Sequence, residues 1–191
     1  MRDTSDDDPR VATYIGFLRA INLGATRKFP KASIIKAVEA AGFTDVQTYI
    51  NTGNVLLSST LATREEVEAA LEESYRGHIG FEVPTIVFTA EEFAGVAAGA
   101  AELHTDDLER HYVNLLKEEP APEKVAELEA RSTDAEKAVV RGRAAHVLIG
   151  SGYQPGRVDP FNAEKTLGVV ATNRNFNVVT TVAQRWCSQE R

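Results

Sequence analysis

The alternation of strand-like and helix-like segments over residues 13–90 constrains the fold more than any other feature of this sequence. Four segments have the residue pattern of β-strands, and two segments between them repeat apolar residues at helical spacing. In chain order, the predicted elements are the strand Tyr14–Ile21, a helix opening at Pro30, the strands Asp45–Asn51 and Val55–Ser59, a helix opening after the Thr63/Glu66 capping box, and the strand Thr85–Thr89. This βαββαβ order predicts an α+β fold with a ferredoxin-like lobe, whose two helices cover one face of a four-stranded antiparallel sheet.

Residues 91–191 are predicted to form a second, smaller α+β lobe that ends in a C-terminal helix. Thr89 and Glu92 form a capping box for its first helix. The later elements are predicted to be the strand His111–Lys117, a short helix from Pro122, the hairpin of Lys137–Arg143 and Ala144–Gly150, the short helix Ala163–Leu167, and a final helix beginning between Thr172 and Asn175. No internal repeat is evident in the sequence. Residues 1–12 are polar and acidic, and we expect them to be a disordered tail.

The residue composition argues against several classes of protein. Cys187 is the single cysteine, so no intrachain disulfide can form, and no run of 18 apolar residues could span a membrane. The first residues lack the basic start and apolar stretch of a signal peptide. We therefore expect a cytoplasmic protein without a membrane partner.

The net charge of −7 is unevenly distributed along the chain. Residues 91–136 carry thirteen acidic and four basic side chains, whereas residues 137–191 carry eight basic and three acidic ones. A general nucleic-acid binder has a broad basic surface, and this chain offers only a local one. Nucleic acid is therefore an unfavoured partner, and a solvated acidic face neutralised by a basic end is the plainer interpretation.

Four short motifs resemble, in the same order, those of domain-of-unknown-function family 1697. They are Leu18–Gly24 (LRAINLG), Tyr49–Val55 (YINTGNV), Val139–Arg143 (VVRGR) and Ala171–Asn177 (ATNRNFN). The resemblance covers about residues 13–186 and implies a ferredoxin-like first lobe and a second α+β lobe, but no activity, substrate or cofactor. Phe176 departs from the tryptophan usual in the family. Val158 and Asp159 stand where a serine-lysine pair often follows, which puts any anion site at that pair in doubt.

The loop after the first strand is one candidate ligand site. Asn22, Gly24 and Lys28 lie just ahead of the helix that opens at Pro30, and a helix N-terminus attracts anions through its unpaired N–H groups. The loop has neither the Walker A spacing nor a G-x-G-x-x-G pattern. A solvent-exposed turn with ordinary surface charges remains the alternative.

Two arginines are further candidates. Arg19 lies among apolar residues of a predicted central strand, and its planar guanidinium suits a carboxylate or phosphate. The alternative for Arg19 is a structural salt bridge to an acidic residue of the 91–136 segment. Arg174 and Asn175 precede the final helix, where they could form an anion site or serve only in capping.

The polar hairpin that contains Asn51 and Asn54 is the last candidate. Asparagine and glycine at a turn are explained by backbone geometry alone, and amide recognition of a ligand or of the other lobe is the functional alternative. Strand ends and turns converge in clefts between lobes. Our leading hypothesis is therefore a small anionic or nucleotide-like ligand, bound in a cleft between the lobes by the residues Arg19, Asn22, Gly24, Lys28, Asn51, Asn54, Arg174 and Asn175.

Two alternatives from other functional classes remain open: a protein-interaction or homodimerising scaffold, and an RNA-binding module. No metal or cofactor is expected, because none of the four histidines has metal-ligand spacing with another. Cys187 lies near a helix C-terminus, which disfavours a thiolate. The sequence leaves open whether the protein is an enzyme, and it favours electrostatic stabilisation by Arg19 and Arg174 over nucleophilic attack.

Overall fold

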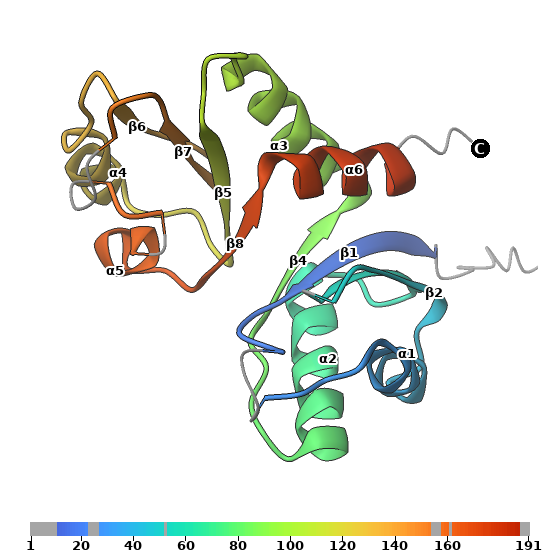
Figure 1. Cartoon of the computed structure of the whole chain (residues 1–191). Helices are drawn as coiled ribbons and strands as arrows, with labels where there is room; N and C mark the ends of the chain where they lie inside the picture. The colour runs from blue at the N-terminus through green and yellow to red at the C-terminus, as the bar shows by residue number, and fades with distance from the viewer. Residues whose placement is uncertain (1–10, 23–26, 52, 154–157, 161, 188–191) are drawn as a thin grey trace, which may run out of the picture.

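A computed structural model describes residues 11–22, 27–51, 53–153, 158–160 and 162–187 of the 191-residue chain (Figure 1). The predicted tail over residues 1–12 lies outside the described residues as far as residue 10. No helix in the described part of the chain is long and apolar enough to cross a membrane. The described residues form two four-stranded antiparallel sheets and six helices, which confirms the α+β fold in two lobes.

The first lobe has the predicted order of elements. They are β1 (Ala12–Leu18), α1 (Lys31–Ala40), β2 (Thr44–Tyr49), β3 (Asn54–Ser59), α2 (Arg64–Ile79) and β4 (Thr85–Thr89). The strand order is β2-β3-β1-β4, so β1 is a central strand. Its side chains are buried on both faces: Tyr14 and Leu18 pack on the side of α1 and α2, and Ile15 and Phe17 pack on the opposite side.

The second lobe repeats this order. Helix α3 (Ala90–Leu103) leads from β4 into β5 (Arg110–Leu116), α4 (Pro122–Glu129), β6 (Glu136–Arg141), β7 (Ala144–Ile149), α5 (Ala163–Leu167), β8 (Ala171–Asn175) and α6 (Phe176–Trp186). The strand order β6-β7-β5-β8 matches β2-β3-β1-β4 position by position. Each lobe is thus a βαββαβ unit followed by one more helix, although the sequence shows no evident repeat. Backbone topology depends on the pattern of buried positions, which two sequences can share without being alike.

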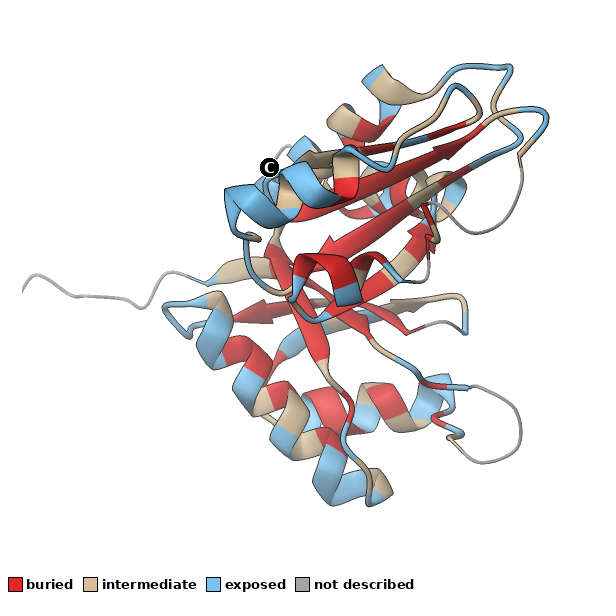
Figure 2. Ribbon diagram, turned by 90° about the vertical axis from the view of Figure 1, so that its left-hand side faces the viewer, coloured by how far each residue is buried: buried red, intermediate tan, exposed pale blue. Residues whose placement is uncertain are grey.

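The helices that follow the two units lie between the sheets (Figures 1 and 2). Helices α3 and α6 pack on each other, and their buried side chains join residues of both sheets in one apolar cluster. Helices α1 and α2 cover the outer face of the first sheet, and α4 and α5 cover the outer face of the second. The face of the first sheet that turns away from α1 and α2 is therefore covered by the second half of the chain.

The structure differs from the predicted elements in two places. The last helix begins where predicted, with Asn175 as its N-cap, but residues 171–175 also form a strand that was not predicted, β8, which pairs with β5 from Leu116↔Ala171 to Tyr112↔Asn175. Strand β1 ends at Leu18 rather than at Ile21, because Ala20 has a left-handed backbone with φ of 55° and cannot continue a strand. Arg19 therefore lies in the loop after the central strand.

Candidate functional site

Arg174 lies in the junction between the two lobes, where its side chain is only 6% exposed. Its Nε donates to Asn54 Oδ1 at 2.7 Å, and its Nη2 donates to the carbonyl oxygens of Leu18 (3.0 Å) and Gly53 (3.2 Å). Its Nη1 donates to Thr172 Oγ1 at 2.9 Å and to a carbonyl of its own strand at 2.8 Å. A guanidinium has five N–H donors, so all of them bind protein acceptors. Burial lowers the pKa of Arg174 to about 10.

The predicted asparagines hold local structure. Asn54 is fully buried, and its Nδ2 donates to the Tyr49 carbonyl across the hairpin at 2.9 Å. Asn22 closes its own loop: Oδ1 accepts from the Phe29 N–H at 2.9 Å, and Nδ2 donates to the Asn51 carbonyl at 2.6 Å. Asn175 caps α6 by accepting from the Val178 N–H at 2.9 Å. The side chain of Asn51 is exposed.

Arg19 and Arg174 line the same pocket, a cavity of about 330 Å³ at the junction of the lobes. Arg19 is 38% exposed and forms a salt bridge from Nη2 to Glu164 Oε2 at 2.9 Å, with an acidic partner outside the 91–136 segment. Lys28 is exposed, and Gly24 lies outside the described residues. The structure thus places Arg19 and Arg174 in the lining of this pocket and joins Asn54 to Arg174. The described residues Asn22, Lys28, Asn51, Asn54 and Asn175 do not line it.

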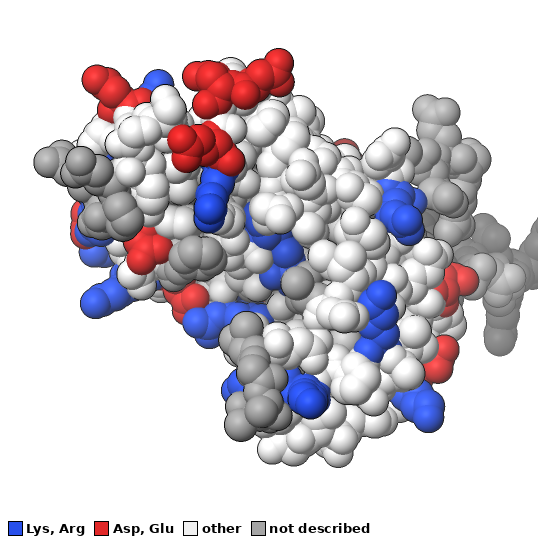
Figure 3. Space-filling view, in the orientation of Figure 1, with Lys and Arg blue, Asp and Glu red and all other residues white. Residues whose placement is uncertain are grey.

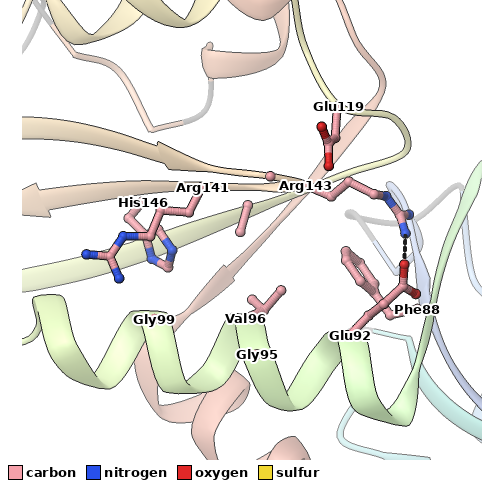
Figure 4. Close-up of a pocket in the computed structure, with 11 residues that line it drawn as sticks. Phe88, Glu92, Gly95, Val96, Gly99, Glu119, Arg141, Arg143 and His146 are labelled. Atoms are coloured by element: carbon pink, nitrogen blue, oxygen red, sulfur yellow. Dashed lines mark ion pairs between the residues drawn. The ribbon is translucent and has the colours of Figure 1, made fainter.

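A second pocket lies between α3 and the hairpin formed by β6 and β7, with a volume of about 240 Å³ (Figure 4). It is lined by Phe88 from the first sheet, by Glu92, Gly95, Val96 and Gly99 from α3, by Glu119, and by residues 141–144 and 146 of the hairpin. We call this cavity the hairpin pocket. Two buried nitrogen atoms in its walls have no hydrogen-bond partner among the described residues, namely Arg143 Nη1 and His146 Nε2.

Arg143 is held rigidly at one end of the hairpin pocket. Its Nε donates to the Leu116 carbonyl at 3.0 Å, its Nη2 donates to the Val87 carbonyl at 2.9 Å, and its guanidinium lies 4.1 Å from the centre of the Phe88 ring. Nη1 is 3.8 Å from Glu92 Oε1, an ion pair beyond hydrogen-bonding distance (Figure 4). Nη1 therefore has an ion-pair partner but no hydrogen bond among the described residues.

Burial and the surrounding charges shift the pKa of Arg143 in opposite directions. Burial lowers the pKa of the guanidinium, and the nearby Arg64 adds to this effect, whereas the carboxylates of Glu92 and Glu68 raise it. Glu68 is itself buried and accepts a hydrogen bond from the Val87 N–H at 2.9 Å. Burial is also the largest influence on Glu68 and raises its pKa, whereas the charges of Lys117, Arg64 and Arg143 lower it. The arginine keeps its charge under these influences, because an ordinary guanidinium titrates above about 12.

His146 lies on β7 at the other side of the hairpin pocket and is 1% exposed. Its Nδ1 lies 3.1 Å from Nε2 of His111 on β5, which leaves Nε2 of His146 facing the pocket. Burial, followed by the charge of Arg141, lowers the pKa of His146 to about 4. His146 is therefore neutral at pH 7 and can either donate or accept one hydrogen bond in the pocket.

Sequence reasoning did not select these residues. The VVRGR motif contains Arg141 and Arg143, but a Gly-centred hairpin flanked by arginines has the ordinary explanation of a solvated turn. The usable signal was His146 within the otherwise apolar strand Ala144–Ile149, because a polar residue buried in such a strand needs a partner.

Comparisons with known proteins agree with this fold. A family model described as "Protein of unknown function (DUF1697)" matches residues 11–146. No curated protein matches the sequence. Among solved structures, the chain is similar to the conserved bacterial protein SP0830 from Streptococcus pneumoniae, with 20% sequence identity and a TM-score of 0.68. The match covers 92% of this chain and 98% of that chain. At this identity the similarity concerns the fold alone.

Proposed function

Since this chain belongs to the DUF1697 family of proteins of unknown function, we propose a function from the site itself: the protein binds a small anionic ligand in the hairpin pocket, between the lobes. The observation that carries the proposal is the pair of buried nitrogen atoms, Arg143 Nη1 and His146 Nε2, that lack a hydrogen-bond partner among the described residues. A buried polar group without a partner costs about 1–3 kcal/mol. A ligand with an acceptor oxygen beside either nitrogen would satisfy that group and recover this free energy.

The shape and chemistry of the pocket favour an oxyanion. A guanidinium held over Phe88 and fixed by two backbone carbonyls presents one fork in a set direction, which suits a carboxylate or a phosphate. The volume of about 240 Å³ is below the range of roughly 300–1,000 Å³ for sites that hold drug-sized ligands. A short carboxylic acid or a phosphate ester therefore suits the pocket better than a whole nucleotide does.

The pocket of Arg19 and Arg174 is the second place for such a ligand, and it contains residues that the sequence selected. It has less support, because every donor of Arg174 already binds a protein acceptor and Arg19 is paired with Glu164. The polar side chains that remain in its lining include Thr172 and Asn173.

A thermal-shift screen with sulfate, phosphate, short carboxylates and sugar phosphates tests the proposal, followed by calorimetry on each compound that stabilises the protein. The variants Arg143→Lys and His146→Phe should each weaken binding about tenfold or more, because one lost charge-assisted hydrogen bond is worth roughly 1.5–3 kcal/mol. Arg131→Gln, an exposed arginine paired with Glu127, is the matched control. Binding that survives both pocket variants but is lost in Arg19→Gln would move the site to the other pocket.

The alternative functions remain predictions without a specific observation in their favour. Helices α3 and α6 cover the sheet face whose exposure would have favoured a homodimer, and light scattering measures the oligomeric state. On the face shown in Figure 3, acidic side chains gather over the upper part of the second lobe, while Lys and Arg lie in several separate groups. A gel shift with mixed single-stranded RNA tests the RNA-binding alternative. The cytoplasmic location is likewise a prediction from sequence.

A further inference from the structure

Three of the four histidines of the chain form a row that leads away from the hairpin pocket. His146 Nδ1 lies 3.1 Å from His111 Nε2, and His111 Nδ1 lies 3.4 Å from His104 Nδ1. His146 and His111 are buried, at 1% and 3% exposed, whereas His104, which follows the end of α3, is partly exposed. Phe176 of α6 stacks on the His104 ring with a centroid distance of 3.8 Å and an interplanar angle of 9°, which fixes the plane of that ring.

The two inner rings are neutral at pH 7. Burial lowers the pKa of His111 to about 4, with further lowering by His146 and His104, and the pKa of His146 is also about 4. A neutral imidazole carries one N–H and one bare nitrogen. In the middle ring, His111, both nitrogens face a ring nitrogen of a neighbour, so His111 must donate to one neighbour and accept from the other.

This constraint leaves two arrangements when all three rings are neutral. In the first, His111 donates to His104 and accepts from His146, so His146 Nε2 is a bare acceptor in the pocket and His104 Nε2 carries a proton. In the second, His104 donates to His111 and His111 donates to His146, so His146 Nε2 is an N–H donor and His104 Nε2 is bare. The two outer Nε2 atoms therefore always have opposite states.

A proton added at His104 removes the first arrangement. With both nitrogens protonated, His104 can only donate to His111 Nδ1, so His111 must donate through Nε2 to His146 Nδ1. The single proton of His146 is then on Nε2, directed into the hairpin pocket. The proton that enters at the exposed end is taken from solvent, and no bond other than N–H bonds is made or broken.

We propose that this histidine row sets the hydrogen-bonding character of the hairpin pocket, so that binding of an anion to Nε2 of His146 and uptake of a proton at His104 favour each other. An anion selects the arrangement in which His146 donates, and that arrangement exposes a bare nitrogen on His104. The inference rests on the proposed function and adds its regulation: the site prefers fully ionised oxyanions, and it binds them more tightly when the exposed end of the row has taken up a proton.

The other charged groups near the row do not produce this effect. The hairpin pocket also contains Arg141, Glu92 and Glu119, and Arg141 is paired with Glu102 of α3 at 2.7 Å; the side chains that line the pocket beside His104 include Glu109 and Arg110. In the described part of the chain, none of these glutamate and arginine side chains hydrogen-bonds to a ring nitrogen of the row. No group of three or more His, Cys, Asp or Glu side chains in the described part of the chain is placed to hold a metal ion.

Long-range proton–nitrogen NMR correlation of ¹⁵N-histidine-labelled protein tests the row, because it identifies which nitrogen of each ring carries the proton. Between pH 8 and 5.5, without any ligand, His146 is expected to shift towards the Nε2–H form as His104 gains its proton. The variant His104→Gln should abolish this shift, and His78→Gln, an exposed histidine on α2, should preserve it. A His146 tautomer that is unchanged over this interval, or that changes equally in His104→Gln, overturns the inference.

Sulfate is the probe for the link to binding, because it does not titrate in this interval. Saturating sulfate at pH 8 should convert His146 to Nε2–H and His104 to Nδ1–H together. If the two neutral arrangements are equally populated, selection of one gives about a twofold gain in sulfate affinity between pH 8 and 5.5, and the gain should disappear in His104→Gln. Absence of sulfate binding with an intact ligand-free NMR response would overturn the proposed function and leave the coupled row standing. Sulfate binding without a change at His104 would overturn the coupling.

Discussion

Replacing Arg174 by methionine removes the side chain that joins the two lobes most directly. Three acceptors of the first lobe would lose its guanidinium: the carbonyls of Leu18 and Gly53, and Oδ1 of Asn54. The Gly53 carbonyl also accepts from the Leu18 N–H at 2.8 Å and so keeps a donor. The Leu18 carbonyl keeps only a long hydrogen bond from Thr172 Oγ1, at 3.5 Å. This carbonyl and Asn54 Oδ1 therefore each lose a charged donor at about 1–3 kcal/mol, which gives roughly 2–6 kcal/mol.

Part of this loss is offset. Burial lowers the pKa of Arg174 to about 10, so the folded state carries a cost for the buried charge that methionine does not have. Methionine also keeps apolar contact with Phe17, whose ring centre lies 5.6 Å from the guanidinium carbon. We therefore expect Arg174→Met to lower the free energy of unfolding by about 2–4 kcal/mol.

Urea unfolding measures this difference with a well-placed reporter. Trp186 is the only tryptophan and is buried at 6% exposure in the apolar cluster between the two sheets, so its fluorescence reports on the packing of the lobes. Arg131→Met is the matched control, because Arg131, just beyond the end of α4, forms an exposed ion pair with Glu127 that is worth at most about 1 kcal/mol. A loss below about 1 kcal/mol for Arg174→Met, or a loss no larger than that of the control, would contradict the role given to Arg174.

Three further predictions concern glycine, histidine and cysteine positions. Gly53→Ala should lower stability by about 2 kcal/mol or more in urea unfolding, because φ is 77° and the added carbon would lie 2.7 Å from neighbouring side chains, whereas Gly77→Ala, in open space on α2, should gain about 0.5–1 kcal/mol. The folded pKa values of His111 and His146 are about 4, below an unfolded value near 6.5, so the unfolded state binds more protons as the pH falls. The free energy of unfolding should therefore fall by about 2 kcal/mol per histidine from pH 7 to 5. His146→Gln should reduce that fall. Burial raises the pKa of Cys187 to about 11, so its reaction with a disulfide reagent at pH 8 should be on the order of 100-fold slower in native protein than in urea.

Local sequence signals predicted the helix starts and most strands of this protein. Both predicted capping boxes are confirmed. The side chains of Thr63 and Thr89 each accept from the backbone N–H of the glutamate three residues later, and the backbone N–H of each threonine donates to the carboxylate of that glutamate. Strand β8 was missed because its sequence, ATNRN, is polar and has no alternation of apolar residues. Its strand geometry depends on pairing with β5, an interaction that no local pattern reveals.

The candidate site was harder to predict than the fold. The sequence placed Arg174 and Asn54 in one neighbourhood, and the structure joins them by a hydrogen bond of 2.7 Å across 120 residues of chain. The row of His104, His111 and His146 could not be predicted, because it depends on the register of β5 against β7, in which Val113 pairs with His146, and on the place where α3 ends. Neither this strand register nor the end of α3 can be predicted from residue spacing along the chain.

The two buried arginines, Arg174 and Arg143, each donate to a backbone carbonyl at the end of the first strand of one unit. Leu18 ends β1 and Leu116 ends β5, and each N–H donates to the residue that precedes the third strand of its own unit, at 2.8 and 2.9 Å. The carbonyl of Leu18 accepts from Arg174, and the carbonyl of Leu116 accepts from Arg143. A strand end buried between two lobes needs a donor that neither sheet supplies, and a guanidinium can reach it while binding further acceptors.

The two arginines differ in the acceptors that are within reach of their remaining N–H groups. Around Arg174 the second acceptors are a buried asparagine and the backbone of both lobes, so the arginine is saturated and its role is structural. Around Arg143 the corresponding space is the hairpin pocket, which leaves Nη1 without a hydrogen bond among the described residues and 3.8 Å from the carboxylate of Glu92. The two junctions thus differ: Arg174 is fully hydrogen-bonded within the protein, whereas Arg143 is part of the proposed anion site. If Arg143→Met destabilised the protein as much as Arg174→Met while every tested anion failed to protect the native protein, both arginines would be structural, and this distinction would be wrong.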